Sequence, residues 1–175
     1  QGCKLGGSGF IVTPSEARTL GDREDNAVNK CIRRIVRGRD LTRRPRPDLV
    51  IDLFGRSEED VRRDLPKVYQ HVLLRVKPER EECRRQSYRD SWWVFQEPRP
   101  DMRAALAGLR RYIATSEVGQ HRTFAFRSWP EELPDGSVMV IASDDAFVLG
   151  VLQSRLHLTW TLRASGTLED RPRYH

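Results

Sequence analysis

The chain has 175 residues, which suits one domain or two small ones that share a core. Its 31 Lys and Arg residues outnumber its 25 Asp and Glu residues, so the formal net charge is +6. Four Trp and six Phe residues argue against a disordered chain, and no apolar run approaches the roughly 18 residues of a membrane span. The three cysteines form no Cys-x-x-Cys pair, which argues against a disulfide framework and a zinc site.

Almost all of the positive charge is arginine, whose planar fork suits phosphates and guanine edges. The alternative is a codon bias that favours arginine throughout the chain, but such a bias does not explain why the arginines cluster. The first residue is Gln1 rather than Met, so we expect a piece of a longer protein. Reduced thiols and the lack of a signal peptide predict a cytoplasmic location.

The start of the chain predicts a strand followed by a helix. The apolar run 10–12 indicates a short strand. Thr13 can cap the helix that follows, and Glu16 completes a capping box. A second strand is expected over 49–54, ending at a glycine.

A second short helix is predicted over 26–36. Val28, Ile32 and Ile35 fall on one face at helical spacing, and Gly38 provides a typical C-terminal stop. A basic loop then continues to residue 47.

The middle of the chain predicts one long, highly charged helix. Ser57 and the three acids after it begin the helix, and Pro78 bends or breaks it before it continues over 79–89. The run 92–95 follows as a strand or turn. The apolar residues expected on the inner face are Val61, Leu65, Val68, Tyr69, Val72 and Val76.

The last third predicts a short helix over 101–109 and strands over 112–115, 122–126 and 138–142. A helix over 146–162 is apolar nearly all round, so we expect it to be central. We interpret Asp144 and Asp145 as its N-terminal cap. Trp92, Trp93 and Trp160 are expected in the core.

These elements predict an α+β fold of small mixed or antiparallel sheets, with a long charged helix and a buried C-terminal helix. Three parts are expected along the chain: residues 1–56, a helical spacer with the Trp-Trp segment over 57–100, and a β-rich part with the central helix over 101–175.

Three basic groups are candidates for nucleic-acid contact. The first lies on the loop after the second predicted helix, where several arginines can follow a phosphate backbone and release counterions. The second lies on the charged helix, where Glu and Arg three or four residues apart usually form surface pairs. The residues assigned to the DNA backbone are Arg37, Gly38, Arg39, Arg43, Arg44, Arg46, Lys77 and Arg80.

The third group flanks a short alternating strand. Gln reads adenine and Arg reads guanine in the major groove, although an ordinary exposed hairpin has the same pattern. The residues assigned to base reading are Gln120, His121, Arg122, Arg127 and Ser128.

Catalytic constellations are absent from the sequence. The four histidines are not spaced as a metal pair, and His157, on an apolar helix, is expected to be a satisfied core residue. The glycine-rich stretch 6–9 has no preceding strand and no dinucleotide-binding spacing.

Several motifs in order resemble MmeI-type restriction–modification proteins. The central ones are Ser91-Trp92-Trp93-x-Phe95, Glu97-Pro98-Arg99-Pro100, Leu109-Arg110-Arg111-Tyr112-Ile113-Ala114-Thr115 and His121-Arg122-x-Phe124-x-Phe126. The later ones are Ile141-Ala142-Ser143-Asp144-Asp145-Ala146-Phe147, Gly150-Val151-Leu152-x-Ser154-Arg155-x-His157 and Pro172-Arg173-Tyr174. Upstream, Gly9-Phe10-Ile11-Val12-Thr13-Pro14 and Gly38-Arg39-Asp40-Leu41 are similar to segments that follow the catalytic domain of adenine-specific DNA methyltransferases.

The resemblance implies a target recognition domain that holds double-stranded DNA for a catalytic methyltransferase domain in the same polypeptide. Such enzymes use S-adenosylmethionine and an Asn-Pro-Pro-Tyr/Phe motif. Neither Asn26 nor Asn29 precedes Pro-Pro, so we expect this chain to bind no cofactor and to be inactive alone. One alternative is a protein-interaction or spacer module of a multi-subunit complex, through the helix over 57–89. A second is a nuclease that uses Asp144, Asp145 and Glu169.

Overall fold

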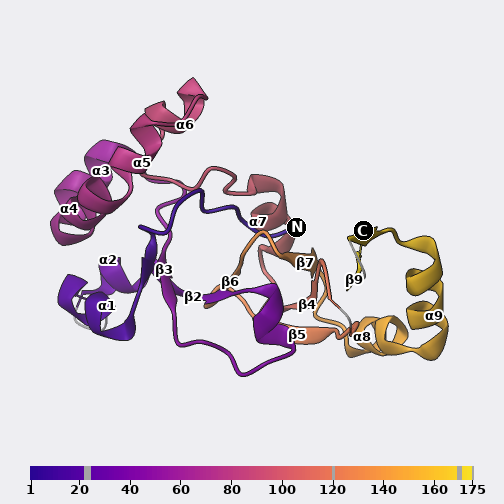
Figure 1. The fold of residues 1–175 in the computed structure, drawn as a ribbon. Helices are drawn as coiled ribbons and strands as arrows, with labels where there is room; N and C mark the ends of the chain where they lie inside the picture. The colour runs from indigo at the N-terminus through magenta and orange to yellow at the C-terminus, as the bar shows by residue number, and fades with distance from the viewer. Residues whose placement is uncertain (22–24, 120, 169–170, 175) are drawn as a thin grey trace. The chain divides into compact units, whose positions relative to one another are not determined.

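The computed structural model describes residues 1–21, 25–119, 121–168 and 171–174, which pack as two compact units (Figure 1). The N-terminal unit comprises Cys3–Ile35 and Pro47–Pro98. The C-terminal unit comprises Gln1–Gly2, Val36–Arg46 and Arg99–His175. The basic segment 36–46 therefore packs with the last third of the chain, whereas the sequence analysis grouped it with residues 1–56. Within the described residues, no helix is long and apolar enough to cross a membrane.

Three short strands form the sheet of the N-terminal unit. β1 (Ile11–Val12) and β2 (Ile32–Val36) both pair antiparallel with β3 (Leu49–Ile51), in the order β1-β3-β2. The helix α1 (Pro14–Leu20) begins directly after β1, and its predicted capping box at Thr13 is confirmed.

The predicted helix over 26–36 is wrong. The helix α2 ends after one turn (Asn26–Asn29), and the chain continues as β2, where Ile32 pairs with Ile51 and Arg34 with Leu49. The β-branched side chains of this segment lose less rotamer freedom on a pleated strand than in a helix. Pairing with β3 therefore overrides a spacing that also fits a helix.

Four helices stand where one long helix was predicted. They are α3 (Glu58–Asp64), α4 (Pro66–Arg75), α5 (Lys77–Glu81) and α6 (Gln86–Asp90) (Figure 1). The first break falls at Leu65 (φ −132°, ψ 54°), because the residue before a proline is forced out of the helical region. The predicted inner face is confirmed for Val61, Leu65, Val68, Val72 and Val76, whose exposed fractions are 0–1%.

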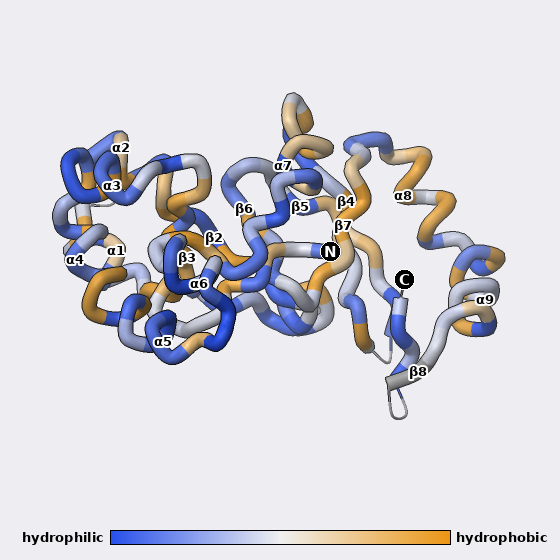
Figure 2. The backbone as a smooth tube through the Cα atoms, turned by 90° about the horizontal axis from the view of Figure 1, so that it is seen from above, coloured by the Kyte–Doolittle hydropathy of each residue, from blue (hydrophilic) through white to orange (hydrophobic). Residues whose placement is uncertain are grey.

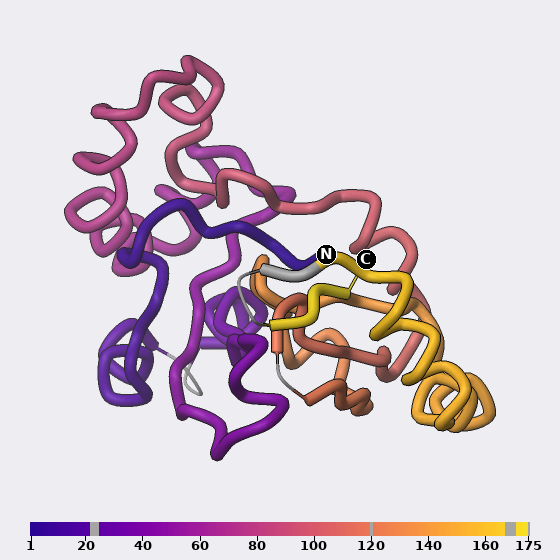
Figure 3. The backbone as a smooth tube through the Cα atoms, turned by 45° about the vertical axis from the view of Figure 1, so that its right-hand side comes forward, coloured from indigo at the N-terminus to yellow at the C-terminus, as the bar shows by residue number. Residues whose placement is uncertain are grey.

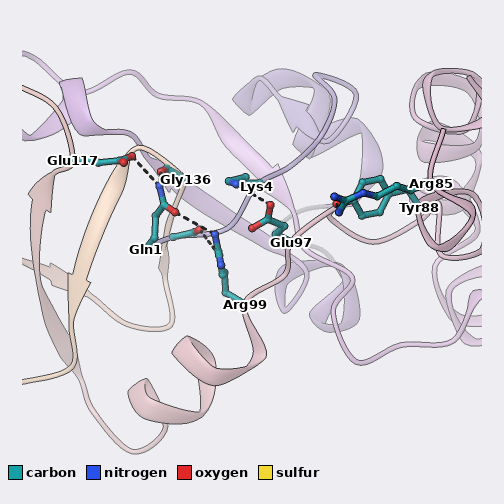
Figure 4. A network of polar contacts seen from close by, with 9 residues as sticks. Gln1, Lys4, Arg85, Tyr88, Glu97, Arg99, Glu117 and Gly136 are labelled. Atoms are coloured by element: carbon teal, nitrogen blue, oxygen red, sulfur yellow. Dashed lines mark hydrogen bonds and ion pairs between the residues drawn. The ribbon is translucent and has the colours of Figure 1, made fainter. Parts of the chain in front are cut away.

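A direct pairing closes the N-terminal unit between residues 4 and 97. The backbone N–H of Lys4 donates to the carbonyl of Glu97 (3.0 Å), and that of Glu97 donates to Lys4 (3.1 Å). Their side chains form an ion pair of 2.8 Å (Figure 4).

The sheet of the C-terminal unit centres on β4 (Arg111–Ser116). It pairs antiparallel with β5 (Ala125–Ser128) and with β7 (Val138–Ile141). Two short helical elements complete the unit's core, η1 (Gly38–Leu41) and α7 (Pro100–Leu106). The remaining strands are β6 (Glu132–Pro134), β8 (Thr167–Leu168) and β9 (Arg171–Pro172). The buried core residues are Val36, Leu106, Tyr112, Ala114 and Val138.

The predicted central helix near the C-terminus is wrong. Ser154 interrupts it, because its hydroxyl accepts from the backbone N–H of His157 (3.2 Å) and so caps a new helix. The result is α8 (Ala146–Gln153) and α9 (Arg155–Ala164). Figure 2 shows α8 as an apolar stretch of backbone, yet none of its residues is buried.

Trp160 on α9 is 65% exposed, so its predicted core position is wrong, whereas Trp92 is buried (4%) as predicted. The Asp145 cap is confirmed, because its carboxylate accepts from the N–H of Phe147 (2.7 Å). The α+β class with small antiparallel sheets is also confirmed.

Candidate nucleic-acid interface

A cationic pocket of about 650 Å³ lies in the C-terminal unit, where η1 meets the end of β4. Its lining combines three guanidinium groups and an imidazole with small and polar residues. No carboxylate is among the described residues that line it. The lining residues are Gly38, Arg39, Thr42, Arg43, Ser116, Val118, Gly119, His121 and Arg171.

Gly38 lets η1 lie directly on β4. A Cβ atom at this position would stand 2.5 Å from Ser116 Oγ and 3.0 Å from the carbonyl oxygen of Ser137. Its backbone N–H donates to Ser137 Oγ (2.8 Å), which ties η1 to the loop before β7. Gly38 was assigned to the DNA backbone, and here it has a packing role: a larger residue would push Arg39 away from the pocket.

A buried carboxylate fixes the turn that presents Arg39. Asp40 is 6% exposed, and its Oδ2 accepts from the backbone N–H of Arg37 (2.9 Å). Nearby, burial raises the pKa of Asp135, although hydrogen bonds from Ser137 oppose the shift. The acids of this region are thus largely buried, whereas Arg39 and Arg43 are exposed.

Four arginines of the predicted backbone-binding group are exposed. Within the residues that the structure describes, their guanidinium groups form no hydrogen bond and no ion pair, unlike those of most other arginines in the chain. Their charge is therefore available to an external anion. These residues are Arg39, Arg43, Arg44 and Arg46. Arg37 is half-buried and has an interaction within the chain.

The last described residues run along the end of β4 and bring Arg171 to the pocket. The N–H of Tyr174 donates to the carbonyl of Glu117 (2.8 Å), and the N–H of Gly119 donates to that of Pro172 (3.3 Å). Arg173 donates to Glu117 Oε1 from Nε (2.9 Å) and Nη2 (2.6 Å). Figure 3 shows this segment in yellow, within the C-terminal unit.

Glu117 also contacts the N-terminal residue of the described chain, Gln1. The side-chain amide of Gln1 donates to Glu117 Oε2 (2.8 Å) and to the carbonyl of Gly136 (2.7 Å), and Arg99 Nη2 donates to Gln1 Oε1 (3.2 Å) (Figure 4). Residues far apart in sequence thus meet at Glu117, which lies between the lining residues Ser116 and Val118 in the chain.

The residues predicted to read bases fall into separate places. His121 is exposed and lines the pocket with Arg39 and Arg43. Ser128 is exposed at the end of β5. Gln120 lies outside the described residues.

Arg122 is engaged inside the protein. Its guanidinium donates to the carbonyls of Ser116 and Pro172 and lies 5.0 Å from the centroid of the Tyr174 ring. Burial lowers its pKa. In this conformation Arg122 positions the C-terminal segment beside the pocket.

Arg127 is also engaged, in a largely buried ion pair with Glu132 (2.8 Å) whose two side chains are 18% and 12% exposed. Its assignment to base reading remains a prediction that requires this pair to open.

Arg80 is 1% exposed, so its assignment to the DNA backbone remains a prediction that requires the side chain to become accessible to a phosphate. Lys77, also assigned there, is half-buried with its ammonium 5.4 Å from the centroid of the Trp92 ring. The sequence analysis placed both residues on a charged helix that Pro78 bends or breaks, and in the structure a new helix begins after Val76.

Five other lining residues were missed by the sequence analysis: Thr42, Ser116, Val118, Gly119 and Arg171. The isolated bridge between Val118 and Arg173 brings them together across more than fifty residues, and such a pairing has no local pattern. Within the described residues, no group of three or more His, Cys, Asp and Glu side chains could hold a metal ion.

The chain matches the model of the MmeI target recognition domain over residues 3–175. A comparison with curated proteins finds no match. Among solved structures, the chain is similar to the Type IIL restriction-modification enzyme MmeI in complex with DNA, with a TM-score of 0.77 and 20% identity. That similarity covers 99% of this chain and 23% of the MmeI chain, and it shows a common fold. The chain therefore belongs to the family of MmeI target recognition domains.

Proposed function

We propose that this chain grips double-stranded DNA and reads its target sequence as part of a longer restriction–modification methyltransferase. The observation that supports it most is the cationic pocket of η1 and β4, where the exposed Arg39 and Arg43 meet Arg171 and no carboxylate is among the described lining residues. Membership of the MmeI family supports the same function, as does the fold shared with an enzyme solved in complex with DNA.

Arg39, Arg43, Arg44 and Arg46 are proposed to contact phosphates. Phosphate contacts set the register of a protein on the duplex, and contacts to base edges carry the sequence specificity. His121 is the proposed base contact, because it is exposed in the same pocket. Arg122 is proposed to act indirectly, by holding the chain end that lines the pocket.

The methyl transfer itself is proposed for a catalytic domain elsewhere in the longer protein. That domain would take the methyl group from S-adenosylmethionine and flip the target adenine out of the helix, since an amine in the base stack is out of reach. This chain has no Asn-Pro-Pro motif, so we expect it to bind no S-adenosylmethionine. A cytoplasmic location belongs to the same proposal.

The test is to map methylated sites in cells that carry the gene of the longer protein. His121→Ala should relax the sequence preference at one base pair by about 1–3 kcal/mol and leave methylation at the other positions. Ser143→Ala, outside the pocket, serves as the matched control. An unchanged methylation pattern in the His121 variant would remove this residue from base reading.

The exposed apolar residues of α8 and α9 favour a second candidate function, docking onto the rest of the same polypeptide. Contiguous exposed apolar surface usually marks a protein interface, and the MmeI chain is more than four times as long as the part matched here. The residues are Phe147, Val151, Leu156, Trp160 and Leu162. Binding that is independent of salt, to protein and not to DNA, would favour this function over the first.

A further inference from the structure

Arg80 carries a buried charge that DNA binding by the cationic pocket does not use. It lies in α5 of the N-terminal unit and is 1% exposed. Its Nη2 donates to the carbonyls of Leu5 (2.7 Å) and Val94 (3.0 Å), and its guanidinium carbon lies 5.7 Å from the centroid of the Phe10 ring. These contacts hold one end of the guanidinium in place.

The rest of the guanidinium has no counter-ion within hydrogen-bond range among the described residues, although Cys83 and Glu79 favour its charged form. Nε and Nη1 are buried and form no hydrogen bond with the described residues, and no carboxylate there forms an ion pair with Arg80. Two Nη2 hydrogens are used, so about three of the five N–H donors of an arginine remain unsatisfied. Each buried donor without a partner destabilises a fold, and a buried charge without a counter-ion does so more strongly.

Burial lowers the pKa of Arg80, but an arginine in a protein remains protonated. Neutralisation of this charge therefore requires an anion.

Arg80 lines a pocket of about 220 Å³ between α5, α6 and the turn before Pro98. The pocket is too small for the ligands that fill clefts of about 300–1,000 Å³, but it has room for a single oxyanion. Three residues that carry hydroxyl groups line it together with Arg80. Its lining residues are Arg80, Ser87, Tyr88, Ser91, Val94, Phe95, Gln96 and Pro98.

A second cation, Arg85, contacts Tyr88, which is one of the lining residues. Arg85 donates to the hydroxyl oxygen of Tyr88 (3.0 Å), and its guanidinium carbon lies 5.5 Å from the centroid of that ring. Figure 4 shows the two side chains stacked. Because the Tyr88 oxygen accepts this bond, its own proton is directed to another acceptor, which an oxyanion in the pocket can supply.

We propose that this pocket is a binding site for a phosphate-type oxyanion, held by Arg80 and by the hydroxyls of Ser87, Tyr88 and Ser91. A tetrahedral phosphate offers more acceptor sites than a carboxylate, which matches the unsatisfied N–H donors of the guanidinium together with three hydroxyls. The source of the phosphate is either the free ion or a phosphodiester of bound DNA. The site lies in the other unit from the cationic pocket, so it does not depend on the proposed DNA function.

The test measures the thermal stability of the 175-residue protein with inorganic phosphate, against chloride and acetate at equal ionic strength. Phosphate should raise the melting temperature by a few degrees, because a ligand bound by the folded state alone stabilises it. Equal shifts with chloride would show an ionic-strength effect, and equal shifts with acetate would show a carboxylate site. Either result would overturn the proposal.

Two variants locate the effect. Ser87→Ala with Ser91→Ala should weaken phosphate binding at least about tenfold, because hydrogen bonds to a charged group are lost. Both serines are exposed, so the double variant should fold, whereas Arg80→Met could fail to fold. The matched control, Arg39→Ala with Arg43→Ala, removes cations from the cationic pocket. If the phosphate effect persists in the serine variant and disappears in the control, the pocket at Arg80 is not the site.

A duplex DNA arm distinguishes the two sources of phosphate. If the serine variant also binds DNA about tenfold more weakly, the phosphate belongs to the DNA backbone. If its DNA affinity is unchanged while its phosphate response is lost, the ligand is the free ion.

Discussion

Removal of Arg43 and Arg44 tests whether the basic loop contacts DNA phosphates. Both side chains are exposed and unpaired among the described residues, so their loss breaks no internal contact. The double variant Arg43→Ala, Arg44→Ala should therefore keep its stability and bind every duplex sequence more weakly.

The size of the effect follows from counterion release. Each phosphate contact contributes about 0.9 to the slope of log K against log salt, so two contacts contribute about 1.8. Between 50 and 200 mM salt, the wild-type protein should then lose about twelvefold more affinity than the variant. Fluorescence anisotropy of a labelled duplex over a salt titration measures both slopes.

The matched control is Arg62→Ala with Lys67→Ala, which removes the same charge from exposed positions on α3 and α4 of the N-terminal unit. Its salt slope should equal that of the wild type. If the Arg43 and Arg44 variant keeps the wild-type salt slope, the loop does not contact phosphates. The same conclusion follows if the salt slope of the control variant falls as much as that of the Arg43 and Arg44 variant.

Three further predictions concern the support of the pocket. Gly38→Ala should reduce the free energy of unfolding, measured in urea, by about 1–3 kcal/mol, because the new Cβ would lie 2.5 Å from Ser116 Oγ. The control is Gly150→Ala in α8, where a Cβ would have no neighbour within 4 Å, and it should be neutral or stabilising. Arg122→Ala should speed hydrogen exchange of the Tyr174 amide, since the guanidinium holds the Pro172 carbonyl; an unchanged rate would show that the chain end is held without it. Asp135→Asn should stabilise the protein at pH values above the ordinary aspartate pKa of about 4. Because the pKa of Asp135 is raised in the folded state, the native protein keeps a proton there that the unfolded chain loses. The free energy of unfolding of the wild type therefore falls as pH rises from the unfolded pKa to the folded pKa, and the variant lacks this loss. Urea unfolding of both proteins across this pH range measures the difference, and parallel curves would contradict it.

Local chemistry made parts of the fold predictable from the sequence. The capping box of Thr13 and Glu16 and the cap at Asp145 depend on residues within a few positions, so their patterns are specific. The β2 strand was missed because its apolar spacing also fits a helix, and only its pairing with β3 decides between the two.

Exposure was the least predictable property. Arg39 and Arg80 look alike in the sequence, yet Arg39 is exposed and Arg80 is 1% exposed. The apolar pattern of α8 and α9 predicted burial, but such a pattern does not show which other surface packs against the helices. In this chain Leu156 is 85% exposed. The cationic pocket could be predicted only in part, because Arg171 reaches it through the pairing of the last residues with the end of β4.

Photochemical cross-linking of the protein to a bound duplex, with the cross-linked peptides mapped by mass spectrometry, tests the central claim most directly. The cross-links should fall in the segment 37–46 and around His121, because Arg39, Arg43 and His121 line one pocket. Cross-links confined to the helices between Glu58 and Asp90, with none in those two segments, would contradict the account.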